Sequence, residues 1–429
     1  MKKILTSVGV VALGASGLQA INIPGITDDS ANKPWNASIA LRGFYDDNIN
    51  TSHEGSKDTV GMEVNPSLGF AMQWEQTKVS ASYSYDFRLY ERKPAGNSDN
   101  YDQTHIVNAA VDHIFSERYK ANASDSFVIG QEPDVLRAGN SFATFQRVSG
   151  YNLRNYGAAA FTAQLTPLLA LKPAYNNAYY SYSQNGGNAD NPSPAGELDR
   201  IESTPSIDTL WTITPTTIGV FGFQFRQAWY TGDEEIGATL NGPVMSGDRD
   251  FREYYLYIGA DTAFRQDLTG SVRVGAQYVE YYHDPSGQDG WGPYAQANVR
   301  WTYNPDCYVE VGLTQDLNAT DVTGTGFNGG NGNSFTVSTE STVLYGSINH
   351  QITPKLKGSL LGQIQNSYFQ GGAFDGDSEQ YYLIGLNFKY QFTPHLAGDA
   401  GYNFDRLDSD VPNRSYSRNR VYIGVSASY

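Results

Sequence analysis

The chain has 429 residues, including 44 Gly and 31 Tyr, and charged residues make up only 17% of it. This composition favours strands and turns, and the charged fraction lies below that of typical soluble proteins. The formal net charge of −16 argues against nucleic acid as a partner.

The first twenty residues predict a secretory signal peptide. Lys2 and Lys3 precede an apolar run, and Ala20 provides a small residue at a cleavage site. An uncleaved anchor is the alternative, but the run is shorter than the ~20 residues that a spanning helix needs. We therefore predict a signal peptide at 1–20, a short periplasmic segment at 21–34 and a membrane domain at 35–429.

The rest of the chain predicts a membrane protein without membrane-spanning helices. No stretch after the leader approaches 18 uninterrupted apolar residues. A closed β-barrel is the other structure that pairs every backbone polar group inside lipid. An exported chain of this kind is therefore either soluble or a barrel, and the strand pattern has to decide.

Alternation with a period of two runs through the chain. In 79–90 (VSASYSYDFRLY), Val, Ala, Tyr, Phe and Leu fall on one face, and Ser, Asp and Arg on the other. The same pattern recurs in 62–75, 221–226, 254–261, 272–278, 295–301, 309–316, 382–389 and 420–429. Two segments blur it, 122–131 and 201–213, where Pro205 falls. Pro173 predicts a bulge or a weakened strand.

The connections alternate strictly between short and long. The short joins are predicted at 75–78, 116–120, 166–168, 214–217, 265–267, 304–306, 353–355 and 393–395. The long joins are predicted at 46–60, 91–101, 132–152, 183–204, 231–250, 281–292, 317–336, 370–379 and 405–418. This asymmetry is typical of a transmembrane antiparallel up-and-down β-barrel with short periplasmic turns and long extracellular loops. We predict about 18 strands, with 16 as the alternative; a soluble sandwich or solenoid is the competing fold.

A proline turn occurs four times, as LTPLL (165–169), ITPTT (213–217), ITPKL (352–356) and FTPHL (392–396). Proline suits a turn because it fixes φ and needs no partner for an N–H group. The residue before it is driven into extended geometry, which ends the strand. Aromatic residues near the turns predict a girdle at the inner lipid interface: Trp74, Phe115, Phe264, Tyr303 and Phe392.

Charged residues on the polar face of the strands assign that face to the lumen. An Arg or Lys facing lipid at the bilayer midplane would cost about 2–4 kcal/mol. We predict six pore-lining residues: Asp86, Arg88, Arg226, Arg273, Arg300 and Glu310. The loops at 132–152 and 183–204 are the candidates for a constriction. Lumenal charge that no solute touches is the alternative interpretation.

The sequence predicts an outer-membrane porin-like channel for passive diffusion of small hydrophilic solutes or ions. A structural or adhesive barrel, or an export channel for surface polysaccharide, are the alternatives. No Ser/His/Asp signature or glycine elbow indicates an enzyme. No cofactor motif is present; the acidic loops at 233–235, 375–379 and 408–410 are candidates for divalent cations, and the overall negative charge favours cations that bridge lipopolysaccharide.

The C-terminal run NRVYIGVSASY resembles the signal strand of bacterial outer-membrane proteins, although those strands usually end in Phe. The resemblance implies recognition of Tyr422, Val425 and Tyr429 by the barrel assembly machinery of a Gram-negative cell. Three features, the C-terminal run, the aromatic-Thr-Pro turns and the segment SDSFVIGQEPDV (124–135), resemble the putative β-barrel porin type 2 family. The resemblance covers most of 35–429. That resemblance implies a barrel in contact with outer-membrane lipid, and leaves a homo-oligomer open.

Overall fold

The computed structural model describes residues 34–429 except 93, 95–98, 132–143, 146, 148–149, 241, 285–288 and 325–333. The predicted signal peptide and residues 21–33 lie outside the described residues, and these assignments remain predictions. Eighteen antiparallel strands form one sheet, which closes where β1 pairs with β20 from Ser38↔Ser428 to Asp46↔Arg420. The fold is therefore the predicted barrel of 18 strands and not the alternative of 16. Within the described residues, no helix is both long and apolar enough to cross a membrane.

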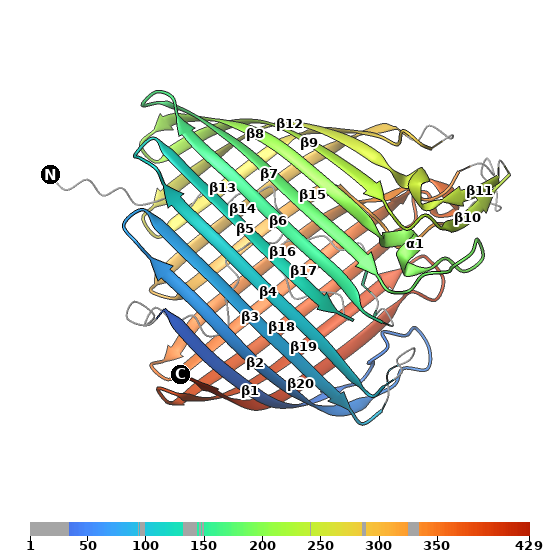
Figure 1. Cartoon of the computed structure of the whole chain (residues 1–429), viewed down its shortest axis with the longest axis horizontal. Helices are drawn as coiled ribbons and strands as arrows, with labels where there is room; N and C mark the ends of the chain where they lie inside the picture. The colour runs from blue at the N-terminus through green and yellow to red at the C-terminus, as the bar shows by residue number, and fades with distance from the viewer. Residues whose placement is uncertain are drawn as a thin grey trace.

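The strands follow one another around the ring in chain order, each paired with the next (Figure 1). Their bounds are β1 Trp35–Asp46, β2 Thr59–Gln73, β3 Thr77–Tyr90, β4 Tyr101–Ile114, β5 Tyr119–Gly130, β6 Asn152–Gln164, β7 Leu169–Tyr182, β8 Arg200–Thr214, β9 Thr217–Tyr230, β12 Phe251–Arg265, β13 Leu268–Glu280, β14 Gly290–Asn304, β15 Cys307–Asn318, β16 Ser338–Thr353, β17 Leu356–Gln370, β18 Ser378–Thr393, β19 Leu396–Ser409 and β20 Tyr416–Ser428. The long loops add helix α1 (Pro194–Leu198), the hairpin β10 (Glu235–Thr239) and β11 (Gly242–Met245), and the short helices η2 (Ser246–Arg249) and η3 (Gly372–Phe374).

All short turns lie at the end of the barrel where β1 begins and β20 ends, and the long loops lie at the other end (Figure 1). An even number of strands brings both termini to one side, as short periplasmic turns require. The alternation of short and long connections is thus a consequence of which side of the membrane each connection occupies.

The repeated proline turns share a hydrogen-bonding device that the sequence pattern alone did not reveal. The hydroxyl of the Thr before Pro accepts a backbone N–H of the turn, as in Lys355 N to Thr353 Oγ1 at 3.3 Å. The same contact recurs at Thr166, Thr214 and Thr393. In three of the turns a Gln two residues before the Thr donates to its carbonyl, as Gln391 does to Thr393 at 2.5 Å. In three of its four copies the repeat therefore extends to Gln-x-Thr-Pro. These side-chain hydrogen bonds stabilise the turns, where few hydrogen bonds between strands remain.

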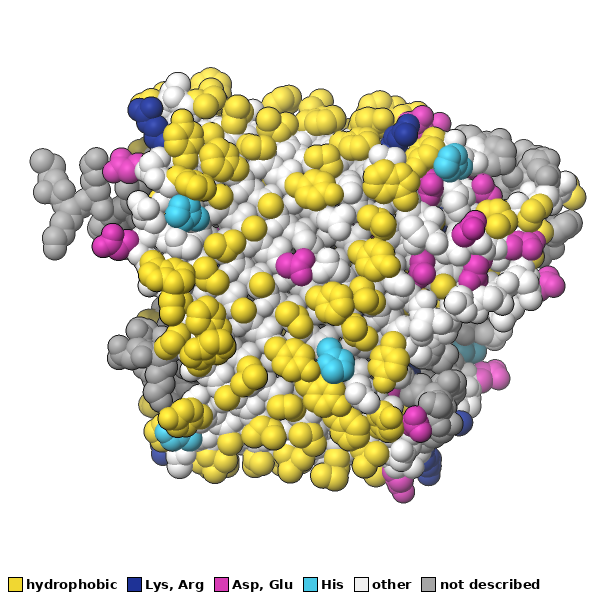
Figure 2. Space-filling view, viewed as in Figure 1, with side chains coloured by type: hydrophobic (Ala, Val, Ile, Leu, Met, Phe, Trp, Pro, Cys, Tyr) yellow, Lys and Arg dark blue, Asp and Glu magenta, His cyan; other side chains and the backbone are white. Residues whose placement is uncertain are grey.

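The outer wall is hydrophobic (Figure 2). Strand residues such as Ile258, Phe223 and Val311 are exposed on it, as the alternation predicts. Large aromatic side chains are exposed at the short-turn end: Trp35, Trp74, Phe115, Trp211, Phe264, Trp301 and Phe392. Apolar exposure on this scale is expected only of a surface that faces lipid or another protein.

Two of the predicted loops have wrong boundaries. Strand β8 begins at Arg200, inside the predicted loop 183–204. Strand β19 continues to Ser409 and β20 begins at Tyr416, which shortens the predicted loop 405–418. These strand ends project beyond the apolar wall, where no lipid contact requires apolar residues to alternate with polar ones. Polar residues such as Arg200 and Glu202 were therefore assigned to loops.

Pro173 and Pro205 neither bulge nor end their strands. The β6–β7 ladder keeps its register from Ala160↔Ala174 to Ala163↔Leu171, with a gap at the proline. The β8–β9 ladder does the same from Ser203↔Gln227 to Ser206↔Gln224. Each proline removes a ladder bond, and the strand continues because its other neighbour and its register hold it in place.

Candidate functional site: the lumenal face

The polar faces of the strands meet inside the barrel. Arg226 on β9 lies 3.7 Å from Asp316 on β15, a strand to which β9 is not paired. Tyr257 on β12 donates to Asp208 on β8 at 2.6 Å, across the intervening β9. Contacts between strands that are not neighbours form only on the concave face of the sheet. The charged face is therefore the interior one.

Asp86 and Arg88 belong to a first interior cluster on β1, β2, β3 and β19. The Arg88 guanidinium lies 2.9 Å from Asp86 and 3.1 Å from Glu63. Arg42 bridges Glu63 at 2.6 Å and Asp399 at 2.5 Å. A pocket of about 260 Å³ adjoins this cluster, with Tyr422 among its lining residues. Both signs of charge thus line the pocket, already paired with one another.

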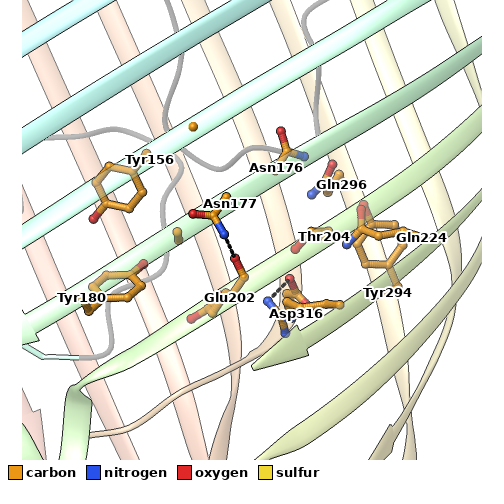
Figure 3. Close-up of a pocket in the computed structure, with 13 residues that line it drawn as sticks. Tyr156, Asn176, Asn177, Tyr180, Glu202, Thr204, Gln224, Tyr294, Gln296 and Asp316 are labelled. Carbon is orange, nitrogen blue, oxygen red and sulfur yellow. Dashed lines mark hydrogen bonds and ion pairs between the residues drawn. The ribbon is translucent and has the colours of Figure 1, made fainter. Parts of the chain in front are cut away.

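Arg226 belongs to a second cluster, with Glu253, Tyr255 and Asp316. Its Nε donates to Glu253 at 2.5 Å, and the Tyr255 hydroxyl, whose single proton the two carboxylates share, lies 2.8 Å from Glu253 and 2.9 Å from Asp316. A pocket of about 100 Å³ adjoins the cluster. Figure 3 shows its lining from β6–β9, β14 and β15, in which tyrosines, amides and carboxylates dominate: Tyr156, Asn176, Tyr180, Glu202, Thr204, Gln224, Tyr294, Gln296 and Asp316.

The other predicted lining residues form separate pairs. Arg273 lies 2.9 Å from Asp261. Arg300 lies directly opposite Glu310 in the β14–β15 ladder, at 3.4 Å, and its guanidinium stacks over Tyr308 at 3.9 Å. The six residues therefore share the interior face but do not form a single site. No sequence pattern indicated Glu253 and Tyr255 as partners of Arg226, because their contacts depend on the register of distant strands.

The loop between β5 and β6 reaches across the barrel. Phe145 is buried and stacks on Tyr381 of β18, with ring centroids 4.6 Å apart. The Tyr416 hydroxyl of β20 donates to the Phe145 carbonyl at 2.9 Å. Arg147, in the same loop, forms an ion pair with Asp102 of β4. Strands β1–β4 separate β5 from β18–β20 in the ring, so this loop narrows the lumen; part of the predicted constriction loop 132–152 lies outside the described residues.

The predicted second constriction loop, 183–204, packs among the other outer loops, and its role as a constriction remains a prediction. Its Glu197 accepts a hydrogen bond at 2.8 Å from Thr323 in the β15–β16 loop. The fully buried Arg249 donates to the carbonyls of Thr320, Val322 and Thr336, at 3.1, 2.6 and 3.0 Å. Phe335 and Val337 pack against Tyr230 on β9 and Phe251 on β12, at the inner face of the barrel. These loops cover the lumen above β9, β12 and β13.

A family model described as putative beta-barrel porin 2 matches residues 35–429. The chain belongs to the putative beta-barrel porin 2 family. The predicted resemblance is thereby confirmed, and this porin-family protein is a protein of the outer membrane.

Solved structures of other porins resemble this porin-family barrel at low sequence identity. They include Pseudomonas aeruginosa OpdK with vanillate (12% identity, TM-score 0.45), a BenF-like porin from Pseudomonas fluorescens Pf-5 (12%, 0.47) and Pseudomonas aeruginosa OccK2 (OpdF) in complex with glucuronate (10%, 0.44). Each covers 92% of this chain, which in turn covers 99%, 99% and 98% of theirs. No curated protein sequence matches the chain.

The predicted assembly residues of the porin-family chain lie on both faces of β20. Tyr422 faces inward, where its hydroxyl donates to Asn387 at 2.5 Å and Arg42 stacks over its ring. Val425 is exposed on the outer wall, and Tyr429 is exposed at the short-turn end, with its backbone bonded to Ala37. Recognition of this strand by the assembly machinery remains a prediction.

The acidic loops do not assemble a metal site. Among the described residues, no three His, Cys, Asp or Glu side chains gather closely enough to hold a metal ion. Glu234 instead accepts from Gly186 N, Gly187 N and Ser193 Oγ, at 2.9, 3.1 and 2.6 Å. These bonds lower the pKa of Glu234 against the effect of burial. Its carboxylate thus fastens the β7–β8 loop to the β9–β12 loop.

The outer loops are expected to loosen as the pH rises. Burial raises the pKa of Glu197 from 4.5 to about 7, an effect that Arg249 opposes and Asp321 reinforces. The pKa of Glu197 is higher in the folded loops than in the unfolded chain. The protonated carboxyl therefore stabilises the folded loops fully below pH 4.5, and this stabilisation is lost as the pH rises through 7. The loss amounts to about 3 kcal/mol at most.

Amide hydrogen exchange at α1, compared at pH 5 and pH 8 after correction for the intrinsic rate, measures this loosening. Glu197→Gln should hold protection nearly constant between the two values. Glu234→Gln is the control: it weakens the attachment of this loop and should lower protection equally at both pH values, because the lowered pKa of Glu234 keeps that group ionised throughout this window. Equal protection of the wild-type loops at both pH values contradicts the prediction.

Proposed function

We propose that the protein is a passive diffusion channel of the outer membrane for small hydrophilic solutes and ions. The observation that carries the proposal is the closed barrel with an apolar outer wall and charges of both signs inside it. Asp86, Arg88, Arg226, Arg273, Arg300 and Glu310 are assigned to the lining that solutes meet. The proposal includes no catalytic step.

The constriction supports small solutes over large ones. Phe145 is held against β18 and Arg147 against β4, so the described part of their loop occupies space that a wide pore would leave open. The interior polar pockets measure about 100 and 260 Å³, the size of a few water molecules up to a small organic solute.

The mixed charge of the lining supports weak ion selectivity. Each of the six assigned residues has an oppositely charged partner, so the interior carries transverse fields and little net charge along the path. A structural or adhesive barrel needs no wettable lumen, and an export channel for polysaccharide needs a wider one.

Single-channel recording in planar bilayers tests the proposal. Discrete, ohmic conductance steps that shrink as sugars of increasing size are added would support a diffusion channel, with the cut-off giving the diameter. A bilayer that stays closed after insertion of folded protein would contradict it and favour the structural or adhesive alternative.

Neutralising Arg226 should make the channel prefer cations. Arg226→Ala leaves Glu253 and Asp316 without their shared cation, which raises the negative potential at that level of the lumen. We expect the reversal potential in a tenfold salt gradient to move toward the cation limit by roughly 10 mV or more. Arg406→Ala is the control, because Arg406 is exposed and pairs with Asp408 at 2.8 Å outside the lumenal clusters. An unchanged reversal potential for Arg226→Ala would remove Arg226 from the ion path.

A further inference from the structure

The outer wall carries one carboxylate where lipid is expected. Asp125 on β5 shares its face with Ala121 and Ala123, which line a hollow on the outer surface. Asp125 is exposed, and Asn155 on β6 donates to its two oxygens at 2.9 and 3.1 Å. Figure 2 shows an acidic side chain near the middle of the wall, among hydrophobic side chains and uncharged polar groups.

The depth of Asp125 places it within the apolar band. It lies six residues beyond Tyr119, which begins β5 at the short-turn end. On a tilted strand this spacing corresponds to roughly 15 Å along the membrane normal, within a band about 25 Å tall. Residues equally far from the girdle on other strands are apolar: Ile258 on β12 and Leu386 on β18. An ionisable side chain at this depth is costly in lipid, and one neutral amide donor offsets little of that cost.

The surroundings of Asp125 are polar as well. Gly157 lies opposite Asp125, Asn177 opposite Gly157, and Ser203 opposite Asn177, so a row of polar and small residues crosses the wall. Gly157 and Asn177 also border the interior pocket of Figure 3, and the alternation of Asn177 with the exposed Tyr175 directs the side chain of Asn177 outward. The Asn177 amide donates to the Glu202 carbonyl at 3.0 Å, and the Tyr175 hydroxyl lies 3.0 Å from Ser203 Oγ. Lipid chains can satisfy none of these groups.

Directly beside this row the wall is hollowed. A shallow groove of about 460 Å³ is floored by Ala121, Ala123 and Ala159 and bordered by Val111, Phe161 and Tyr175. The Phe161 ring stacks on Tyr119 at 6.0 Å and forms a ridge next to the groove. A ridge and a hollow on the same face, with small residues between them, permit close approach of another wall.

We propose that this face, formed by the outer sides of β4–β8 and here called the Asp125 face, is where a second copy of the chain docks in the membrane. The row supplies an acceptor, the Asp125 carboxylate, and a donor, because only one of the paired Tyr175 and Ser203 hydroxyls donates to the other, so it can complement itself. The ridge of one copy fits the hollow of the next. The wall around Ile258 and Leu386 is largely apolar, with Phe221, Val274 and Leu360 opposite these residues, and the nearby Tyr402 hydroxyl already donates to Asn419, so it is the lipid-facing side. This inference concerns the outer wall and does not depend on what passes through the lumen.

The test is the oligomeric state of the intact protein, first in native outer-membrane vesicles and then in mild detergent. Asn177→Cys should give a disulfide-linked dimer of the chain upon mild oxidation in vesicles, since the native Cys307 is buried. Sedimentation of the wild type should give a discrete oligomer. Ala159→Trp, which fills the hollow, should weaken association by about tenfold or more.

Two further variants separate docking from misfolding. Asp125→Leu suits a lipid-facing wall, so it should yield a folded monomer with an intact heat-induced gel shift. Ile258→Trp places the same bulk on the other side of the barrel and should leave the oligomer unchanged. A monomeric wild type, an oligomer that survives both Asp125→Leu and Ala159→Trp, or a cross-link to a different polypeptide or a lipid would each overturn the proposal.

Discussion

Replacing Asp405 by alanine should destabilise the barrel by about 3–5 kcal/mol, because a buried ion pair is broken from one side. Asp405 on β19 is fully buried, and its two oxygens accept from Arg418 Nε at 3.1 and 3.2 Å. Arg420 lies 3.6 Å from the same carboxylate. Removal of the carboxylate takes away the anion that two neighbouring guanidinium groups on β20 share at the interior face of the β19–β20 pair, next to where β20 closes on β1.

Urea unfolding of the protein in detergent micelles, followed by the loss of the heat-modifiable gel band, measures the difference in stability. Asp408→Ala is a matched control on the same strand. Its partner Arg406 and Asp408 itself are both about half exposed, and such pairs are worth about 0–1 kcal/mol. A midpoint for Asp405→Ala within error of that control would show that Arg418 and Arg420 are stabilised by other groups.

The sequence predicted the barrel well because membrane and strand impose independent patterns that agree. Alternation of Val79, Ala81 and Tyr83 with serines specifies the two faces, and the Thr-Pro turns specify which connections are short. Together they fix the strand number, since each long loop must be followed by a short turn. Where strands extend beyond the membrane, as at Arg200 and Ser409, the backbone hydrogen bonds between strands continue but the alternation of apolar and polar residues ends. The strand boundaries there could not be predicted from polarity.

The segment 122–131 blurred the alternation for a reason that the structure supplies. Strand β5 carries Asp125 outward and buries Ser126 and Val128 inward, which reverses the usual assignment of polar and apolar residues. A single sequence read for polarity alone cannot distinguish such a strand from a loop.

The lumenal residues were predicted by type and face, but their groupings were not. Arg226 meets Asp316 because β9 and β15 face each other across the interior, which depends on the register of the strands between them. Phe145 gave no signal in its loop, since its partners Tyr381 and Tyr416 lie more than two hundred residues away along the chain.

Releasing the loop of Phe145 should enlarge the conductance roughly twofold or more, since the narrowest section of a channel dominates its resistance. Two side-chain anchors hold this loop, in addition to hydrogen bonds of its backbone with Tyr416 and Thr51. Phe145 packs with Tyr381, Leu383 and Leu407 on the inner wall, and the buried Arg147 pairs with Asp102 and donates to Gln131 at 2.9 Å. The double variant Phe145→Ala/Arg147→Ala removes both anchors and leaves every strand intact.

Conductance and the sugar size cut-off should rise together in this variant, because a loop that no longer crosses to β18 widens the path for ions and neutral solutes alike. A rise in conductance with an unchanged cut-off would mean that only the local charge had altered. Phe221→Ala is the control: Phe221 is 54% exposed on the outer wall, so its loss should leave both quantities unchanged. If the folded double variant conducts like the wild type, the narrowest section lies elsewhere, beneath the outer loops that Arg249 holds over β9 and β12.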